Sequence, residues 1–224
     1  MNRTLEHILP RVQKPARYTG GEYNAVVKDR RAVDVRYALC FPDTYEIGMS
    51  NLGVRILYGL MNEMDGVWCE RVFAPWGDME EEMRREGIPL YGLESGDSIA
   101  DFDLIGFSLG YEMAYTNVLN MLDLAGLPLR SGERTELSPI VVAGGTCAFN
   151  PEPLAPFVDL FVLGEGEDVS VEIIQLYRQA REEGWGKEEF LTAAARIPGV
   201  YVPSLYEVSY HGDGTVAAVT PLEG

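Results

Sequence analysis

The stretch Val33-Asp34-Val35-Arg36-Tyr37-Ala38-Leu39-Cys40-Phe41 becomes continuously apolar toward its end, and Pro42 and Asp43 stop it. A run of this kind is typical of a strand buried on both faces, as in a parallel sheet. After a loop, apolar residues recur at helical spacing, at Leu52, Ile56, Leu57, Leu60, Met61 and Met64. Ser50 or Asn51 is placed to cap this helix. A strand, a glycine-bearing loop and a helix therefore follow one another in order.

The same unit is repeated along the chain. We predict further strands at residues 67–73, 104–107, 140–143 and 160–163, and helices near 77–86, 115–125 and 169–180. Strands that alternate with helices predict an α/β domain with a doubly wound, flavodoxin-like, mostly parallel sheet of five strands. We assign this domain to residues 33–197.

Two flanking segments have other patterns. Residues 1–32 are mixed and basic, and prolines and glycines interrupt any long helix, so we expect an N-terminal extension that wraps or links. In residues 198–224, the apolar positions from Tyr201 to Tyr210, the turn Gly212-Asp213-Gly214 and the run Val216 to Val219 predict a C-terminal β-hairpin.

The composition limits the classes of partner. The 224 residues are 46% apolar and 24% charged, which is ordinary for a globular protein. With 18 Lys+Arg against 35 Asp+Glu, the net charge of -17 would repel the phosphates of nucleic acid and of an anionic membrane. No apolar run approaches the roughly 20 residues of a membrane span. We therefore expect no nucleic-acid partner and no membrane partner.

The cysteines and histidines exclude several sites. Cys40, Cys69 and Cys147 are too scattered for a metal ligand set, and their odd number indicates a reducing cytoplasm. The histidines, His7 and His211, lie in the extension and in the predicted hairpin, so no nucleophilic triad is visible. Neither G-x-G-x-x-G nor a P-loop follows a predicted strand. We name no catalytic residue and no metal ligand.

The loops after four predicted strands are the expected ligand site. In an open parallel sheet, ligands bind outside the carboxyl ends of the strands. The loops after the first, third, fourth and fifth strands, residues 42–51, 108–111, 144–147 and 164–168, each contain glycine. Glu165 and Glu167 suit hydroxyl or amide donors, although acidic residues also stabilise any helix start.

These loops resemble a known family. The stretches Gly144–Pro153 and Asp159–Glu167, with Leu104–Ser108, resemble the cobalamin (B12)-binding-type domain that precedes many radical SAM domains. The order of elements agrees over residues 33–180, and the whole chain is similar to the front of an uncharacterised radical SAM subfamily. The resemblance implies cobalamin, with its nucleotide tail lying against Ser108 and Gly144-Gly145. It also implies a partner, a downstream radical SAM domain of the same protein, which would hold the 4Fe-4S cluster and S-adenosylmethionine.

The chain departs from the family pattern at two places. Cobalamin domains with a histidine on cobalt carry Asp-x-His-x-x-Gly, whereas Asp43-Thr44-Tyr45-Glu46-Ile47-Gly48 has Tyr45 at the histidine position. A neutral phenol is a poor cobalt ligand, so we predict cobalamin held without a histidine ligand. Gly110 stands where the family's Ser-x-Leu pattern has a larger residue. The Cys-x-x-x-Cys-x-x-Cys motif of radical SAM chemistry is missing, so we expect this part of a radical SAM enzyme not to be catalytic by itself.

Three hypotheses follow from these residues. The first is a domain that holds cobalamin, with the candidate binding residues Asp43, Tyr45, Gly48, Ser108, Leu109, Gly144, Gly145, Thr146, Gly164, Glu165 and Gly166. The second is a vestigial, ligand-free scaffold that orients substrate or partner, in which Tyr45 fills the space of the corrin. The third is an independent small enzyme or phosphoacceptor, which Ser108 and Gly164 disfavour because they stand where an aspartate and a lysine would be needed.

Overall fold

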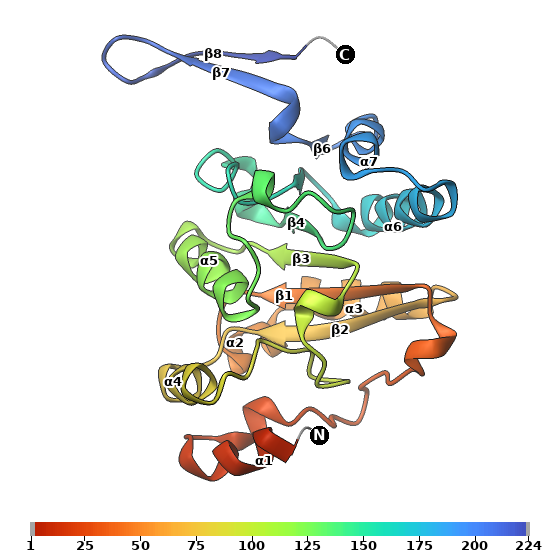
Figure 1. Ribbon diagram of the computed structural model, residues 1–224, viewed down its shortest axis with the longest axis vertical. Coiled ribbons are helices and arrows are strands. Elements are labelled where there is room, and N and C mark those ends of the chain that lie inside the picture. The colour runs from red at the N-terminus through yellow and green to blue at the C-terminus, as the bar shows by residue number, and fades with distance from the viewer. Residues whose placement is uncertain (1–2, 223–224) are drawn as a thin grey trace.

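The computed structural model describes residues 3–222 as one six-stranded sheet, covered by helices, and a separate two-stranded hairpin (Figure 1). The strand order in the sheet is β2-β1-β3-β4-β5-β6. The strands are β1 (Val35–Phe41), β2 (Val67–Phe73), β3 (Leu104–Ser108), β4 (Ile140–Gly144), β5 (Leu160–Val162) and β6 (Val200–Tyr201). The first five are parallel, and β6 pairs antiparallel with β5.

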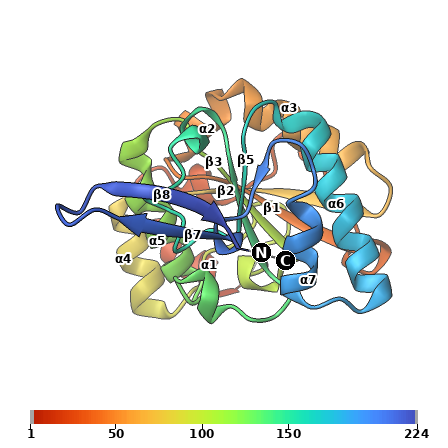
Figure 2. The same ribbon diagram turned by 90° about the horizontal axis from the view of Figure 1, so that it is seen from above.

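Helices cover both faces of the sheet (Figure 2). On one face lie α3 (Leu52–Glu63), α6 (Gly166–Glu183) and α7 (Lys187–Ala194). On the other lie α4 (Gly77–Glu86), α5 (Tyr115–Leu124) and α1 (Arg3–Ile8). Successive residues of β1 contribute to the two cores in turn, Tyr37 and Leu39 to one and Ala38 and Cys40 to the other. This two-sided burial explains why the predicted strands are continuously apolar.

The parallel strands place a ligand crevice at the centre of the sheet. Their order, β2-β1-β3-β4-β5, is that of doubly wound folds of the flavodoxin type. The chain passes from β1 to β2 on one side and then to β3 on the other, so the order reverses between β1 and β3. In such sheets, ligands bind at this switch point, outside the carboxyl ends of the strands. The predicted α/β class and mostly parallel sheet are confirmed.

The sheet has a sixth strand that the sequence did not predict. Val200 and Tyr201 pair with Val162 and Phe161 of β5, although we had assigned Tyr201 to the hairpin. The short 3-10 helix η8 (Pro203–Leu205) separates β6 from the hairpin. Apolar residues alternate with other residues on both sides of Pro203, so the sequence pattern did not separate β6 from the hairpin. The hairpin itself consists of β7 (Tyr206–Tyr210) and β8 (Val216–Pro221), and it projects from the body of the domain (Figure 1).

The N-terminal extension packs onto the sheet at the opposite end from the hairpin. Leu5, Ile8, Val12 and Tyr18 are buried in the core on the α4 side. Further along, the Lys28 ammonium donates hydrogen bonds to backbone carbonyls of α3 and β2. The extension is therefore part of the folded body.

Two short helical segments lie at the carboxyl end of the sheet. The helix α2 (Tyr45–Ser50) follows β1 and leads into α3, and the 3-10 helix η7 (Thr146–Phe149) follows β4. Asn51 caps α3, because its side chain accepts a hydrogen bond from the Val54 N–H at 3.0 Å. Of the two predicted caps, Ser50 and Asn51, the structure therefore has Asn51. Across residues 3–222, no helix has the length and apolar character that crossing a membrane requires.

Candidate functional site

A groove of about 200 Å³ lies at the carboxyl ends of β1, β3, β4 and β5, beneath α3 and α6. We call it the strand-end groove. Much of its wall is backbone, because its lining includes Gly53, Gly106, Gly144, Gly145, Gly164 and Gly166. Leu39, Val142 and Val162 give it an apolar floor. The groove therefore lets a flat apolar group approach the sheet closely.

Two glycines are required by the geometry of the strand ends. Gly145 has φ +98, and a Cβ there would lie 2.7 Å from the carbonyl oxygen of Leu109. Gly164 has φ +117 at the turn into α6, a conformation that side chains with a Cβ rarely adopt. The ends of β3, β4 and β5 can come together in this way only with glycine at these positions.

The N-terminus of α6 supplies polar groups to the groove. This helix of 18 residues begins at Gly166, and the side chain of the preceding Glu165 makes no capping hydrogen bond. The first N–H groups of α6 are thus available as donors at the positive end of the helix dipole. The Glu165 and Glu167 carboxylates beside them are acceptors. One end of the groove can therefore bind both acceptor and donor atoms of a ligand.

Six of the predicted site residues come together here. They are Ser108, Gly144, Gly145, Gly164, Glu165 and Gly166, all of which line the groove. The other five predicted residues lie outside it. Leu109 is fully buried on the opposite face of the sheet, and its N–H donates to the Gly144 carbonyl at 2.7 Å. The Thr146 hydroxyl donates to the Gly110 carbonyl at 3.3 Å. These two residues fix the loops that frame the groove.

The loop after β1 faces away from the groove. The Tyr45 hydroxyl donates to the Glu22 carboxylate of the extension at 2.6 Å. Burial, together with this hydrogen bond, raises the pKa of Tyr45 to about 12, so the phenol stays neutral. Asp43 accepts a hydrogen bond of 2.5 Å from the Tyr111 hydroxyl, and a Cβ on Gly48 would lie 2.1 Å from the Phe73 ring. In this structure, Asp43, Tyr45 and Gly48 tie the loop to its neighbours.

Sequence reasoning missed the groove residues that lie inside helices and strands. Tyr37 and Gly106 belong to β1 and β3, and Leu57 and Ser170 belong to α3 and α6. Only the strand-end loops had been searched for ligand contacts. Every second side chain of a strand points to the same face, so this rule would have placed Tyr37 on the same face of β1 as Leu39 and Phe41.

The described residues, 3–222, contain no group of three or more histidine, cysteine or acidic side chains that could hold a metal ion. His7 lies in α1, and His211 lies in the turn of the hairpin. Burial and the nearby Glu112 carboxylate raise the pKa of the Cys147 thiol, so it stays protonated at neutral pH. The described lining of the groove offers hydrogen-bonding groups and apolar contact.

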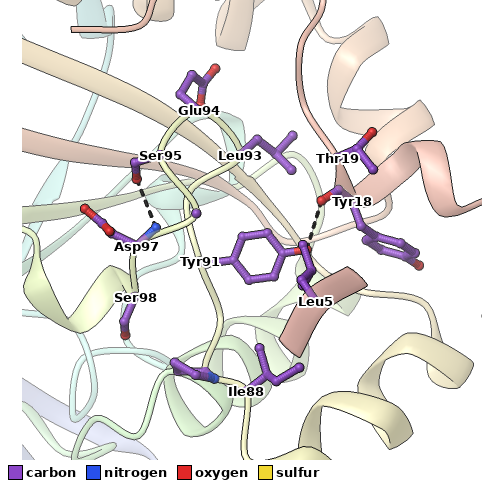
Figure 3. Close-up of a pocket in the computed structure, with 12 residues that line it drawn as sticks. Leu5, Tyr18, Thr19, Ile88, Tyr91, Leu93, Glu94, Ser95, Asp97 and Ser98 are labelled. Carbon is purple, nitrogen blue, oxygen red and sulfur yellow. Dashed lines mark hydrogen bonds between the residues drawn. The ribbon is translucent and has the colours of Figure 1, made fainter. Parts of the chain in front are cut away.

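Two other cavities lie away from the carboxyl ends of the strands. One of about 290 Å³ lies between the extension and residues 88–98 (Figure 3). Polar groups there bond within the protein, since the Tyr91 hydroxyl donates to the Tyr18 carbonyl at 3.0 Å. The other, of about 400 Å³, lies near α7 and is lined by Arg134 and Lys187. The Lys187 ammonium is bonded to the Asp159 carboxylate and to two backbone carbonyls.

A family of known proteins and one curated protein match this chain. Residues 53–203, more than half of the chain, match the family described as "Radical SAM proteins, N-terminal". The chain belongs to this family. The matched part of this radical SAM N-terminal domain contains the loops after β3, β4 and β5 but not the loop after β1. The matched residues therefore include most of those that line the groove, and they leave out Asp43, Tyr45 and Gly48.

One curated relative is also similar to this radical SAM N-terminal domain. An uncharacterized protein of Methanocaldococcus jannaschii is 28% identical over 140 residues, which cover 61% of this chain and 26% of the relative. The chain thus spans about a quarter of the length of the curated relative that it matches. No solved structure matches the chain.

Proposed function

We propose that this radical SAM N-terminal domain binds cobalamin in the strand-end groove, with no protein ligand to cobalt, and presents it to the radical SAM domain of the same protein. The observation that carries the proposal is a glycine-walled groove at the carboxyl ends of the strands, where open α/β sheets bind their ligands. The family of the matched residues supports the second part, because it consists of N-terminal parts of radical SAM proteins.

The residues of the groove fit the nucleotide tail of cobalamin. The tail ends in a heterocyclic base, for which Leu39, Val142 and Val162 form an apolar floor. Its ribose hydroxyls suit the Glu165 and Glu167 carboxylates as acceptors. These carboxylates stand beside the first N–H groups of α6 and would repel a phosphate there, so the phosphate would lie farther out from this helix end.

The corrin would lie outside the groove, at the carboxyl end of the sheet. The loops there expose Tyr111, Met113 and Phe149, which are large enough to contact a macrocycle. Because the Tyr45 hydroxyl is bonded to Glu22, it is not directed at a metal. When bound, cobalamin would supply a cobalt centre that can carry a methyl group or an electron.

The test is retention of hydroxocobalamin during gel filtration of the purified chain. We expect corrin absorbance to elute with the protein, with an unchanged spectrum in Tyr45→Phe. Gly144→Leu should abolish retention, because a leucine side chain would project into the groove. Gly59→Leu, on an open part of α3, is the matched control and should retain the cofactor. Folded wild-type protein that elutes without corrin absorbance would contradict the proposal.

A scaffold function is the second candidate, and the size of the groove favours it. Its volume of about 200 Å³ is below the roughly 300 to 1,000 Å³ of most small-molecule sites. The Tyr37 ring also occupies the space directly above Gly106. A scaffold would retain no cobalamin, and Gly144→Leu would leave the function of the longer protein unchanged.

A further inference from the structure

The Tyr37 hydroxyl opens into the strand-end groove and has no hydrogen-bond partner among the described residues. Tyr37 lies on β1, is 5% exposed, and lines the groove. Its hydroxyl is so close to β3 that a Cβ on Gly106 would be 1.9 Å away. No residue in the range 3–222 forms a hydrogen bond with this hydroxyl. Burial raises its pKa, so it is an intact O–H donor.

Other buried tyrosines are bonded within the chain. The Tyr58 hydroxyl accepts a hydrogen bond from the Val26 N–H at 2.7 Å. The Tyr91 hydroxyl donates to a backbone carbonyl, and the Tyr177 hydroxyl donates to Asp103 at 3.0 Å. Leaving a buried hydroxyl unpaired is unfavourable, so buried polar groups without partners are uncommon in folded proteins. The Tyr37 hydroxyl is therefore the exception among these tyrosines.

Two serine hydroxyls join Tyr37 in the groove. Ser170 lies on α6 and is 8% exposed, and Ser108 ends β3. Within the described part of the chain, neither side-chain hydroxyl has a hydrogen-bond partner. Three hydroxyls from β1, β3 and α6 thus line one cavity, each with its bonding capacity free. Such a set can bond a ligand from three sides.

The cavity is suited to a ring. A cavity of about 150 Å³ with aliphatic walls binds benzene, so about 200 Å³ can hold a larger heterocycle. Leu39 and Val162 offer apolar contact to its faces, while Tyr37 offers a donor at its edge. We propose that Tyr37 donates a hydrogen bond to a ring nitrogen of an aromatic heterocycle in the groove, and that Ser108 and Ser170 bond oxygens of the sugar attached to that ring. This inference rests on the proposed function, in which the heterocycle is the base of the nucleotide tail.

The first test uses the ligand-free protein. Tyr37→Phe removes a hydroxyl that forms no hydrogen bond with the described residues, so we expect its melting temperature to equal or exceed that of the wild type. Tyr91→Phe is the matched control, because it removes a buried tyrosine hydroxyl that is bonded to the Tyr18 carbonyl outside the groove, and it should lower the melting temperature. A clear fall in the melting temperature of Tyr37→Phe would mean that the hydroxyl has a structural partner, and would overturn the inference.

The second test compares three probes by equilibrium dialysis: hydroxocobalamin, cobinamide, which lacks the nucleotide tail, and free 5,6-dimethylbenzimidazole. Tyr37→Phe should raise the Kd of hydroxocobalamin and dimethylbenzimidazole about 5- to 10-fold, with no change for cobinamide and none for any probe in Tyr91→Phe. Equal Kd values in Tyr37→Phe and the wild type would overturn the role of Tyr37 but not the binding of cobalamin. Binding of dimethylbenzimidazole without binding of hydroxocobalamin would overturn the cobalamin function and support the heterocycle site. Binding of no probe would overturn both.

Discussion

The side-chain amide of Asn62 makes with Cys69 the two hydrogen bonds that a neighbouring strand would make. The amide donates to the Cys69 carbonyl at 2.9 Å and accepts from the Cys69 N–H at 3.1 Å. Two residues further along β2, the Arg71 N–H donates to the Glu94 carboxylate at 2.8 Å, and its carbonyl accepts from the Leu93 N–H. The outer edge of the sheet is thereby closed to a further strand.

Asn62→Ala should lower the free energy of unfolding by about 1 to 3 kcal/mol, because it leaves a backbone donor and acceptor of Cys69 unpaired. Urea denaturation would measure the change. The control is Gln179→Ala, which removes an exposed amide bonded only to Glu183 and should change stability by less than about 0.5 kcal/mol. Equal effects of the two substitutions would contradict a role of Asn62 in closing the edge.

Asp159→Asn should be the more damaging of two acidic substitutions. Asp159 is buried between the Arg134 and Lys187 side chains. In the variant, these two side chains would keep their positive charges but lose this counterion. Breaking a buried ion pair by removing one partner typically destabilises by about 3 to 5 kcal/mol. Asp123→Asn breaks an exposed pair with Arg84 and should cost less than about 1 kcal/mol. Thermal denaturation of both variants would compare their stabilities. Similar melting temperatures would contradict the expectation that Asp159→Asn is the more destabilising.

The attachment of the extension should weaken in acid. The hydrogen bond from Arg17 holds the pKa of the Glu46 carboxyl at about 2, below its ordinary value of about 4.5. A depressed pKa in the folded state stabilises the protein above about pH 4.5, and this contribution is lost as the pH falls toward 2. Glu46→Gln should therefore be less stable than the wild type at pH 7, and the difference should shrink toward pH 2. Denaturation at a series of pH values would measure it; a difference independent of pH would count against this account.

Gly106→Ala should destabilise the domain by about 1 to 3 kcal/mol, because the new Cβ would lie 1.9 Å from the Tyr37 hydroxyl oxygen and force the ring to move. Gly59→Ala is the opposite case. Its Cβ would meet nothing within 4 Å, and alanine in the interior of α3 should stabilise by about 0.5 to 1 kcal/mol. Calorimetry of the two variants would reveal shifts of opposite sign. An unchanged or raised melting temperature of Gly106→Ala would show that the Tyr37 ring can move away freely.

The sequence predicted those parts of the fold that local pattern determines. The strands β1 to β5 are buried on both faces, and β2 begins and ends where its pattern does, at Val67 and Phe73. The strand β6 was missed because two residues carry no periodicity, and only their pairing with β5 defines them. The helix α7 was also not predicted.

The groove was predicted only in part. Glycine at the strand ends indicated Gly144, Gly145 and Gly164, because those positions depend on backbone conformation. Tyr37 and Ser170 could not be found in the same way, since their roles depend on which elements pack across the groove. Tyr45 was selected by a motif, but its hydroxyl is bonded to Glu22, which lies 23 residues away in the extension. Contacts of this kind are set by tertiary structure.

The N-terminal extension and the C-terminal hairpin lie at opposite edges of the sheet (Figure 1). The extension covers the β2 edge, and the hairpin follows β6. Since adjacent strands are spaced by about 4.8 Å, five intervals separate these edges by roughly 24 Å. The sheet thus acts as a rigid spacer, and a partner bound to the hairpin would not compete for space with one bound to the extension.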